Sequence, residues 1–442
     1  MALVEAVVTN FLGAFVLFLL CSVVYNWVKG RGYPPGPLGL PVIGYMPFLG
    51  KKPNITLKEL SKKYGDIFSF YIGPQLIICV SEYELAKEIL NHPLALARPP
   101  HSFDFLVGKG GFSGMSGEEW QEQRRFALST IRNLGLGKGL WETMIQTLRK
   151  LGKKLMDKFS AVDLTINLPW LTKLVEFLNL SGLQDFMMLL NNFEDIFKKE
   201  VERRLLSKDK WTEDDFIGCY LREMEKRKSD SQPHNFTMEN LRGNLFILFV
   251  AGQDSTVGSV GWLLLLMAKH PNVQQKICDE IDKAIGRDGT VYYGDRNKLP
   301  YTTATLLEMM RFITINPLFP PRYVLDIFTF NGFTIPKGAH IVCNSWAMLH
   351  DPRYFEDPMT FKPERFISQE GKCVKLDGYG PFSFGKRNCP GEGIAMMTMY
   401  LYFVSIMQKF KIKTPYDLPP DMTYKFSAGI LPNPQKLCFM ER

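Results

Sequence analysis

The stretch FSFGKRNCPG, residues 382–391, decides how the chain is interpreted. Its Cys389 lies in a loop bearing Gly and Pro, directly before the apolar run 393–410, which has the length and composition of a helix. Unpaired N–H groups and the positive dipole end at the start of such a helix stabilise a thiolate. Because a single cysteine is more often an inert buried thiol, the neighbouring residues decide between the two interpretations.

Those neighbours suit a flat, negatively charged cofactor. Gly385 and Gly391 let the backbone approach a planar group closely. Phe382 can cover the sulfur of Cys389, and Arg387 can neutralise a carboxylate at the edge of the cofactor. The loop therefore predicts a bound cofactor with Cys389 as its metal ligand.

The composition is that of a large globular protein. The chain has 442 residues, of which 46% are hydrophobic and 22% charged, so disordered and fibrous classes are excluded. No linker or repeat follows the first fifty residues, which predicts one large domain over residues 31–442. The eight cysteines form no CxxC pair, which argues against a disulfide scaffold and a structural zinc site.

The net charge of +8 is spread over local clusters of Lys and Arg. No long basic block alternates with aromatic residues, so we expect no nucleic-acid partner. The charge favours an anionic membrane surface or an acidic protein partner, with a solvated helix face as the alternative for each cluster.

The N-terminus predicts a transmembrane anchor within residues 1–30. The run Ala6–Val28 carries no charge and is long enough to cross a bilayer as a helix. A cleaved signal peptide is the alternative, but the basic segment that would begin it is missing. Basic residues follow the run, which predicts a cytoplasmic location for the remainder. Residues 33–41, YPPGPLGLP, then form a stiff hinge.

The middle of the chain is mainly helical in pattern. Residues 240–270 have helical length, but Asp254, Ser255 and Thr256 interrupt their apolar character. A second membrane span would not carry these groups at its centre without function. We therefore expect a helix through the core with a loosened turn at 251–256.

Two further segments complete the expected fold class. Residues 303–315 indicate a helix on which Glu308 and Arg311 can pair, although this spacing usually marks an ordinary surface ion pair. Residues 328–335 place Asn-Gly between alternating β-favouring residues, which predicts a hairpin. The expected fold is mainly α with a minor β part (α+β).

The stretch 382–391 matches the Phe-x-x-Gly-x-Arg-x-Cys-x-Gly haem-binding loop of the cytochrome P450 family, which this chain therefore resembles. Other family motifs occur in the expected order along nearly the whole chain. Trp120 and Arg124 resemble the pair that reaches a haem propionate, and residues 251–256 resemble the oxygen-activation segment. The anchor and hinge resemble the microsomal branch that includes drug- and steroid-oxidising enzymes.

The resemblance implies a P450-like haem-thiolate fold and roles for further residues. Glu308, Arg311 and Arg365 would form the family's Glu–Arg–Arg cluster. Arg98 and Arg322 would join Trp120, Arg124 and Arg387 as partners of the propionates of haem b. Among the catalytic candidates Asp254, Ser255 and Thr256, the acid would relay protons and the hydroxyl of Ser255 would bond to the oxygen ligand. The structural alternative is that Asp254 and Ser255 form hydrogen bonds within a kinked helix and have no catalytic role.

Two departures from the family pattern stand out. Ser255 occupies a position where the family usually has Thr, so its hydroxyl is held less rigidly. Between Trp120 and Asp254 the chain is shorter than the family pattern by a helix or more, at about residues 164–170. Either another segment fills the space, or the chain is a splice form or sequence defect that binds haem poorly. Residues 170–197, rich in Leu, Phe and Met, are compatible with substrate-access helices, with a segment that dips into the membrane, and with ordinary helix core.

Three functions are compatible with these features. The first is a monooxygenase of the endoplasmic reticulum membrane that acts on a small hydrophobic molecule, with NADPH–cytochrome P450 reductase as electron donor and cytochrome b5 as a second candidate donor. The second is a haem-thiolate enzyme that rearranges peroxides, against which Asp254 and Ser255 argue. The third is an inactive haem-binding or scaffold protein, which only the missing helix supports.

Overall fold

The computed structural model describes residues 32–100, 111–134, 195–206, 211, 215–229, 234–426 and 429–442. The predicted anchor and most of the shortened region therefore lie outside the described residues. The chain divides into two compact units, and the expectation of one domain over residues 31–442 stays a prediction. The first unit comprises Met1–Leu96 and Pro320–Asn344, and the second comprises Ala97–Phe319 and Ser345–Arg442.

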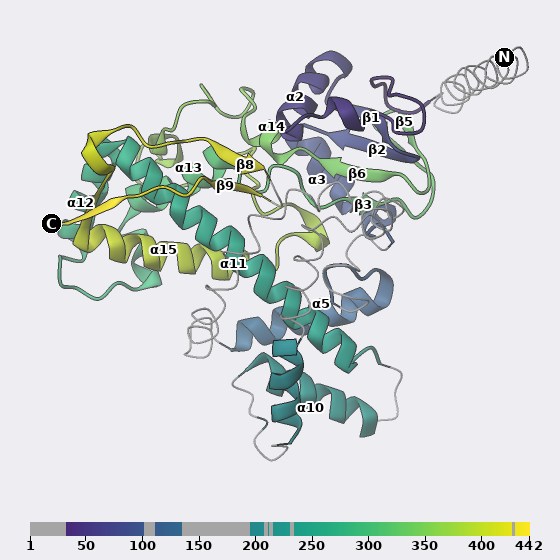
Figure 1. The fold of residues 1–442 in the computed structure, drawn as a ribbon, viewed down its shortest axis with the longest axis horizontal. Coiled ribbons are helices and arrows are strands. Elements are labelled where there is room, and N and C mark those ends of the chain that lie inside the picture. The colour runs from purple at the N-terminus through teal and green to yellow at the C-terminus, as the bar shows by residue number, and fades with distance from the viewer. Residues whose placement is uncertain are drawn as a thin grey trace, which may run out of the picture. The chain divides into compact units, whose positions relative to one another are not determined.

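A four-stranded sheet with the strand order β1-β2-β6-β3 forms the centre of the first unit (Figure 1). β1 and β2 are antiparallel, β2 and β6 are parallel, and β6 and β3 are antiparallel. The elements of this unit are β1 (Ile67–Ile72), β2 (Gln75–Val80), β3 (Arg322–Tyr323), β4 (Phe328–Phe330), β5 (Phe333–Ile335), β6 (His340–Cys343), α2 (Pro53–Tyr64), α3 (Tyr83–Asn91) and the 3-10 turns Met46–Phe48 and Pro93–Ala95.

The sequence of β2 explains its central place. Its last five residues are all buried, as expected for an apolar run with no polar face. The hairpin predicted at Asn-Gly is confirmed, because β4 and β5 pair across a turn in which Asn331 has φ 48° and Gly332 has φ 79°. Both values lie in the left-handed region that this two-residue turn requires.

The second unit is predominantly helical and also carries two short hairpin-like sheets, which confirms the mainly α fold with a minor β part. Its helices are α5 (Gly117–Asn133), α10 (Phe216–Ser229), α11 (Met238–Lys269), α12 (Pro271–Ala284), α13 (Pro300–Ile313), α14 (Ser345–Leu349) and α15 (Glu392–Lys409). Its strands are β7 (Phe410–Lys413), β8 (Tyr424–Phe426), β9 (Ile430–Pro432) and β10 (Cys438–Glu441), with 3-10 turns at Tyr293–Asn297, Pro363–Phe366, Gly385–Arg387 and Pro415–Asp417.

The long helix α11 begins at a side-chain cap and ends before a proline. The Thr237 hydroxyl accepts the N–H of Asn240 at 3.1 Å, and Pro271 opens the next helix. The helix continues without interruption through 251–256, so the predicted loosened turn is wrong. Among the described helices α11 alone is long and apolar enough to cross a membrane. Its C-terminal half is nevertheless packed in the protein core, as we expected.

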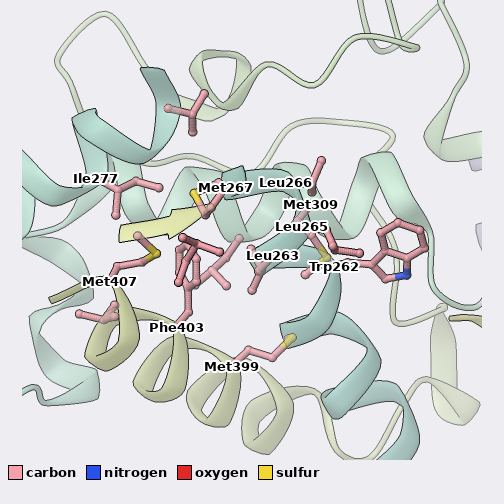
Figure 2. Packing of buried hydrophobic residues seen from close by; sticks show 14 of the residues in the cluster. Trp262, Leu263, Leu265, Leu266, Met267, Ile277, Met309, Met399, Phe403 and Met407 are labelled. Carbon is pink, nitrogen blue, oxygen red and sulfur yellow. The ribbon is translucent and has the colours of Figure 1, made fainter. Parts of the chain in front are cut away.

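That core lies between α11 and α15 (Figure 2). Apolar side chains from α11, α12, α13 and α15 interleave there, and Phe403 of α15 is fully buried. The indole N–H of Trp262 donates to the carbonyl of Ile430 at 2.9 Å, which ties α11 to β9. The labelled members are Trp262, Leu263, Leu265, Leu266, Met267, Ile277, Met309, Met399, Phe403 and Met407.

A second apolar cluster joins α5, α10 and the N-terminal half of α11. Phe197 and Val201, from the helical residues 195–205, are buried in it together with Trp211. The rings of Phe197 and Phe249 lie 6.1 Å apart, which places this short helix against α11. Residues 195–206 and Trp211 thus pack against the N-terminal half of α11, whereas residues 170–194 lie outside the described part.

Candidate active site

The loop that carries Cys389 is closed by its own backbone. The N–H of Cys389 donates to the carbonyl of Phe382 at 2.8 Å, and the N–H of Asn388 donates to the carbonyl of Gly385 at 3.0 Å. Gly385 adopts φ 71°, which a residue with a side chain rarely takes. Gly391 caps α15, so the sulfur of Cys389 lies just before the first turn of that helix.

The surroundings of the thiol do not by themselves favour its ionised form. Burial raises the pKa of Cys389 above its ordinary value, and Glu392 raises it further. A hydrogen bond from the backbone of Gly391 and the charge of Arg124 lower the pKa but do not compensate. Burial therefore opposes the thiolate that the loop was expected to stabilise, and that expectation stays a prediction. A coordinated metal ion removes the proton of a thiol outright.

Trp120 and Arg387 stack in the interior of the second unit. The guanidinium carbon of Arg387 lies 3.7 Å from the centre of the Trp120 ring, and both side chains are buried. Arg387 donates to the carbonyls of Met115, at 2.6 Å, and Phe112, at 3.4 Å. The indole N–H of Trp120 is buried and has no acceptor among the described residues. A buried donor of this kind costs free energy unless an acceptor arrives from outside the chain.

Two further predicted cofactor ligands lie in the same unit. Arg124 donates to the backbone and side-chain oxygens of Asn388, next to Cys389. Burial lowers the pKa of Arg124 and the charge of Cys389 raises it. Arg98 donates through Nε to the carbonyl of Ser113 at 3.2 Å, so it contacts the same short segment as Arg387. Arg322 lies buried on β3 of the first unit, and its predicted role stays a prediction.

These residues fit a haem. A cysteine before a helix, a buried indole N–H without an acceptor and neighbouring guanidinium groups form a donor set for a planar metal cofactor with carboxylate substituents. The ring of Phe382 is half-buried and packs at the edge of the α11–α15 core.

The acid and hydroxyl of α11 occupy different environments. Burial raises the pKa of Asp254 to about 6, and no ion-pair partner for it occurs among the described residues. A carboxyl group with this pKa can take up and release a proton near neutral pH. The hydroxyl of Ser255 donates to the carbonyl of Ala251 at 2.8 Å, and Thr256 is half-buried beside it. This bond to the preceding turn lets the helix continue through a polar stretch.

The structure brings Glu308, Arg311 and Arg365 together. Glu308 and Arg311 are fully buried and share two hydrogen bonds of 2.7 and 2.8 Å. Arg365 reaches the same carboxylate at 3.1 Å, and the backbone N–H of Lys362 bonds to it at 2.8 Å. The pair is therefore not the surface ion pair that its spacing alone would suggest.

Sequence reasoning missed the buried amides Gln123 and Asn244. Both side chains are fully buried, and they bond to each other at 2.8 Å between α5 and α11. The only signal in the sequence is a polar residue at each of two positions that otherwise belong to the apolar face of a helix.

Comparisons with known proteins identify the family of the chain. The family model described as Cytochrome P450 matches residues 34–174 and 142–439. Cytochrome P450 2C41 of Canis lupus familiaris is 34% identical over an alignment of 485 positions, gaps included, which covers 96% of this chain and 98% of that protein. Cytochrome P450 2C8 of Homo sapiens is 32% identical, with coverage of 96% and 99%, and cytochrome P450 2U1 of Bos taurus is 29% identical, with coverage of 97% and 94%.

The same comparisons support the shortened region. The two matched segments overlap at residues 142–174, which include 164–170. The alignment with bovine cytochrome P450 2U1 extends over 509 residues, more than the 442 of this chain, so some positions of the relative have no counterpart here. Because the family model and the relatives nevertheless cover nearly the whole chain, the chain belongs to the cytochrome P450 family of haem-thiolate monooxygenases.

Proposed function

We propose that this chain inserts one oxygen atom of O2 into a small hydrophobic substrate, with electrons from NADPH delivered by NADPH–cytochrome P450 reductase and, as a second donor, cytochrome b5. The buried indole N–H of Trp120 supports the haem on which this reaction depends, because it lies under Arg387 and lacks an acceptor among the described residues. The carboxylate edge of a haem supplies such an acceptor.

Haem b is the proposed cofactor, and when bound it supplies the redox centre at which oxygen is activated. Cys389 would ligate its iron, and the Phe382 carbonyl fixes the backbone of that cysteine. Phe382, Gly385 and Gly391 would line the face next to the sulfur. The residues proposed to bind its propionates are Arg98, Trp120, Arg124, Arg322 and Arg387.

On the opposite face, Asp254 and Ser255 would handle protons. Asp254 takes a proton from solvent and releases it, since its pKa of about 6 lies close to physiological pH. The hydroxyl of Ser255 donates to Ala251 and still has lone pairs that can accept a proton from a neighbouring donor. Thr256 offers a second hydroxyl on the next residue.

We further propose that residues 1–30 anchor the protein in the endoplasmic reticulum membrane. Residues 31–442 would then face the cytoplasm beyond the hinge at 33–41. The uncharged run Ala6–Val28 and the basic residues after it support this orientation, and the net charge of +8 suits an acidic electron donor.

The absorption spectrum of the reduced, carbon-monoxide-treated protein tests the proposal. We expect a strongly red-shifted Soret band in the wild type that is lost in Cys389→Ser and kept in Cys373→Ser, a matched change at a partly buried cysteine. NADPH consumption with purified reductase then separates a monooxygenase from an enzyme that rearranges peroxides. A band without NADPH consumption would refute the reductase-dependent reaction.

A second candidate function is an impaired haem-binding form. The shortened region favours it, because the family match is split within residues 142–174. This candidate predicts no red-shifted band in the wild type when haem is supplied. It also predicts that added haem leaves the unfolding temperature unchanged, since a ligand that does not bind cannot stabilise.

A further inference from the structure

A buried cluster of amides joins three helices beside the proposed haem site. The Oε1 atom of Gln123 on α5 accepts from Nδ2 of Asn244 on α11 at 2.8 Å and from the hydroxyl of Tyr220 on α10 at 3.1 Å. Its Nε2 atom donates to the carbonyl of Asn235 at 2.8 Å. Burial raises the pKa of Tyr220, so its phenol keeps the proton that it donates. Both the oxygen and the nitrogen of the Gln123 amide therefore have hydrogen-bond partners within the protein interior.

The fourth bond leads toward the cofactor ligands. Oδ1 of Asn244 accepts the backbone N–H of Phe112 at 2.8 Å. Phe112 opens the segment 112–115, whose carbonyls receive the guanidinium of Arg387. Gly111, with φ 99°, brings this segment against α11 so closely that a Cβ there would lie 2.9 Å from the carbonyl oxygen of Gly243. The amides of α5 and α11 thus hold the backbone to which Arg387 is bonded.

The same pair also fixes α5. Trp120 lies three residues before Gln123 on one face of the helix, and Arg124 is the next residue along the chain. Because buried amide bonds are directional, the Gln123–Asn244 pair limits both the rotation of α5 and its distance from α11. One pair of neutral side chains therefore positions Trp120 and Arg124 through α5. The same pair positions Arg387 through segment 112–115.

We propose that Gln123 and Asn244 are positioning residues for the propionate edge of the haem, acting through α5 and through segment 112–115. The inference rests on the proposed function, because it presumes a haem at Cys389. The pair touches neither substrate nor cofactor in this assignment. It sets where the donors Trp120 and Arg387 lie, so its loss should raise the rate of haem release and shift the reduction potential.

Asn244→Leu removes both bonds of the amide with little change in volume, and Asn240→Leu is its matched control. Asn240 lies one turn earlier on α11, is also buried, and bonds through Nδ2 to Glu119 and to the Asn235 carbonyl. It makes no bond to segment 112–115 among the interactions of the described residues. Asn244→Asp keeps an acceptor for the N–H of Phe112 and, when protonated, a donor for Gln123.

Three measurements on the full-length protein decide the matter: haem transfer to apomyoglobin, the reduction potential, and hydrogen exchange of peptides covering 111–116. We expect about tenfold faster haem transfer, a shifted potential and faster exchange in Asn244→Leu. Haem transfer and potential should be near wild type in Asn240→Leu and in Asn244→Asp. Gln123→Met gives the same test if Asn244→Leu does not fold.

Two results would overturn the inference. Faster exchange at 111–116 with unchanged haem transfer and potential would make the pair merely structural. Equal acceleration in Asn244→Leu and Asn240→Leu would mean that haem release follows the loss of any contact between α5 and α11, since Asn240 also bonds to Glu119 of α5, and not the hold of Asn244 on segment 112–115. A wild-type protein without the red-shifted Soret band would instead refute the proposed function, and the exchange measurement would still report whether Asn244 holds segment 112–115.

Discussion

The second unit contains two buried arginine clusters that differ in how their polar groups are satisfied. In the first, the carboxylate of Glu308 receives Arg311, Arg365 and a backbone N–H, so its charge is compensated within the chain. In the second, Arg387 lies over Trp120, whose indole N–H has no acceptor in the described part of the chain. Both clusters contain buried guanidinium groups, but only the second also contains a buried N–H donor, that of Trp120, without an acceptor among the described residues.

This difference indicates that the Glu308 cluster stabilises the fold, whereas the Trp120 cluster is suited to bind a ligand. A buried charge is stable only when it is paired and hydrogen-bonded, and the Glu308 cluster meets both conditions with its own residues. In the Trp120 cluster the indole N–H has no acceptor among the described residues, so it is paired only when an acceptor arrives from outside. Removal of a partner from the first cluster should therefore destabilise the protein with or without cofactor, whereas changes in the second should act mainly on the cofactor-bound form.

The largest effect is expected for Glu308→Gln. This change leaves the fully buried Arg311 without its counterion, which costs about 3–5 kcal/mol in the free energy of unfolding. Urea unfolding followed by circular dichroism measures it. Glu364→Gln is the control, because Glu364 pairs with Lys276 on the surface and such a pair contributes about 1 kcal/mol at most. Equal losses in the two variants would contradict the distinction between the clusters.

Asp254 extends the comparison to a half-buried carboxyl without an ion-pair partner in the described residues. Its raised pKa means that the folded state holds its proton up to about pH 6, whereas the unfolded state releases it near pH 4. The free energy of unfolding should therefore fall by roughly 2–3 kcal/mol between pH 4 and 6 and stay lower above that range. Unfolding at a series of pH values, with Asp254→Asn as comparison, tests this, since the variant should lack that part of the fall.

Trp120→Phe removes the unpartnered N–H but keeps a ring beneath Arg387. Haem should dissociate about tenfold faster, as expected for the loss of one charge-assisted hydrogen bond of about 1.4 kcal/mol. The haem-free protein should be as stable as wild type or more so, because an unsatisfied buried donor is gone. Trp211→Phe is the matched control: its N–H donates to the carbonyl of Arg204 at 2.7 Å, so its loss should lower stability and leave haem release unchanged.

The sequence predicted those parts of the fold and site that depend on local chemistry. The turn at Asn331 and Gly332 follows from residues that tolerate positive φ, and the loop before α15 follows from its glycines and cysteine. The pairing of Gln123 with Asn244 could not be predicted, because it joins residues 121 positions apart. The pKa of Cys389 was missed for a similar reason, since it depends on how deeply tertiary packing buries the thiol.

The uninterrupted course of α11 leads to the smallest predicted effect. We expected the polar residues at 253–256 to loosen the helix, but the Ser255 hydroxyl bonds to the carbonyl of Ala251 and the helix continues. Ser255→Thr adds a methyl group that restricts the rotation of this hydroxyl without removing it. We therefore expect unchanged stability within about 0.5 kcal/mol and a modest rise in product formed per NADPH consumed. Product, NADPH and released hydrogen peroxide are measured together, with Ser259→Thr, whose hydroxyl bonds to the carbonyl of Ser255, as control. The same gain in both variants would mean that helix rigidity, and not the placement of the hydroxyl at 255, sets how efficiently electrons reach the product.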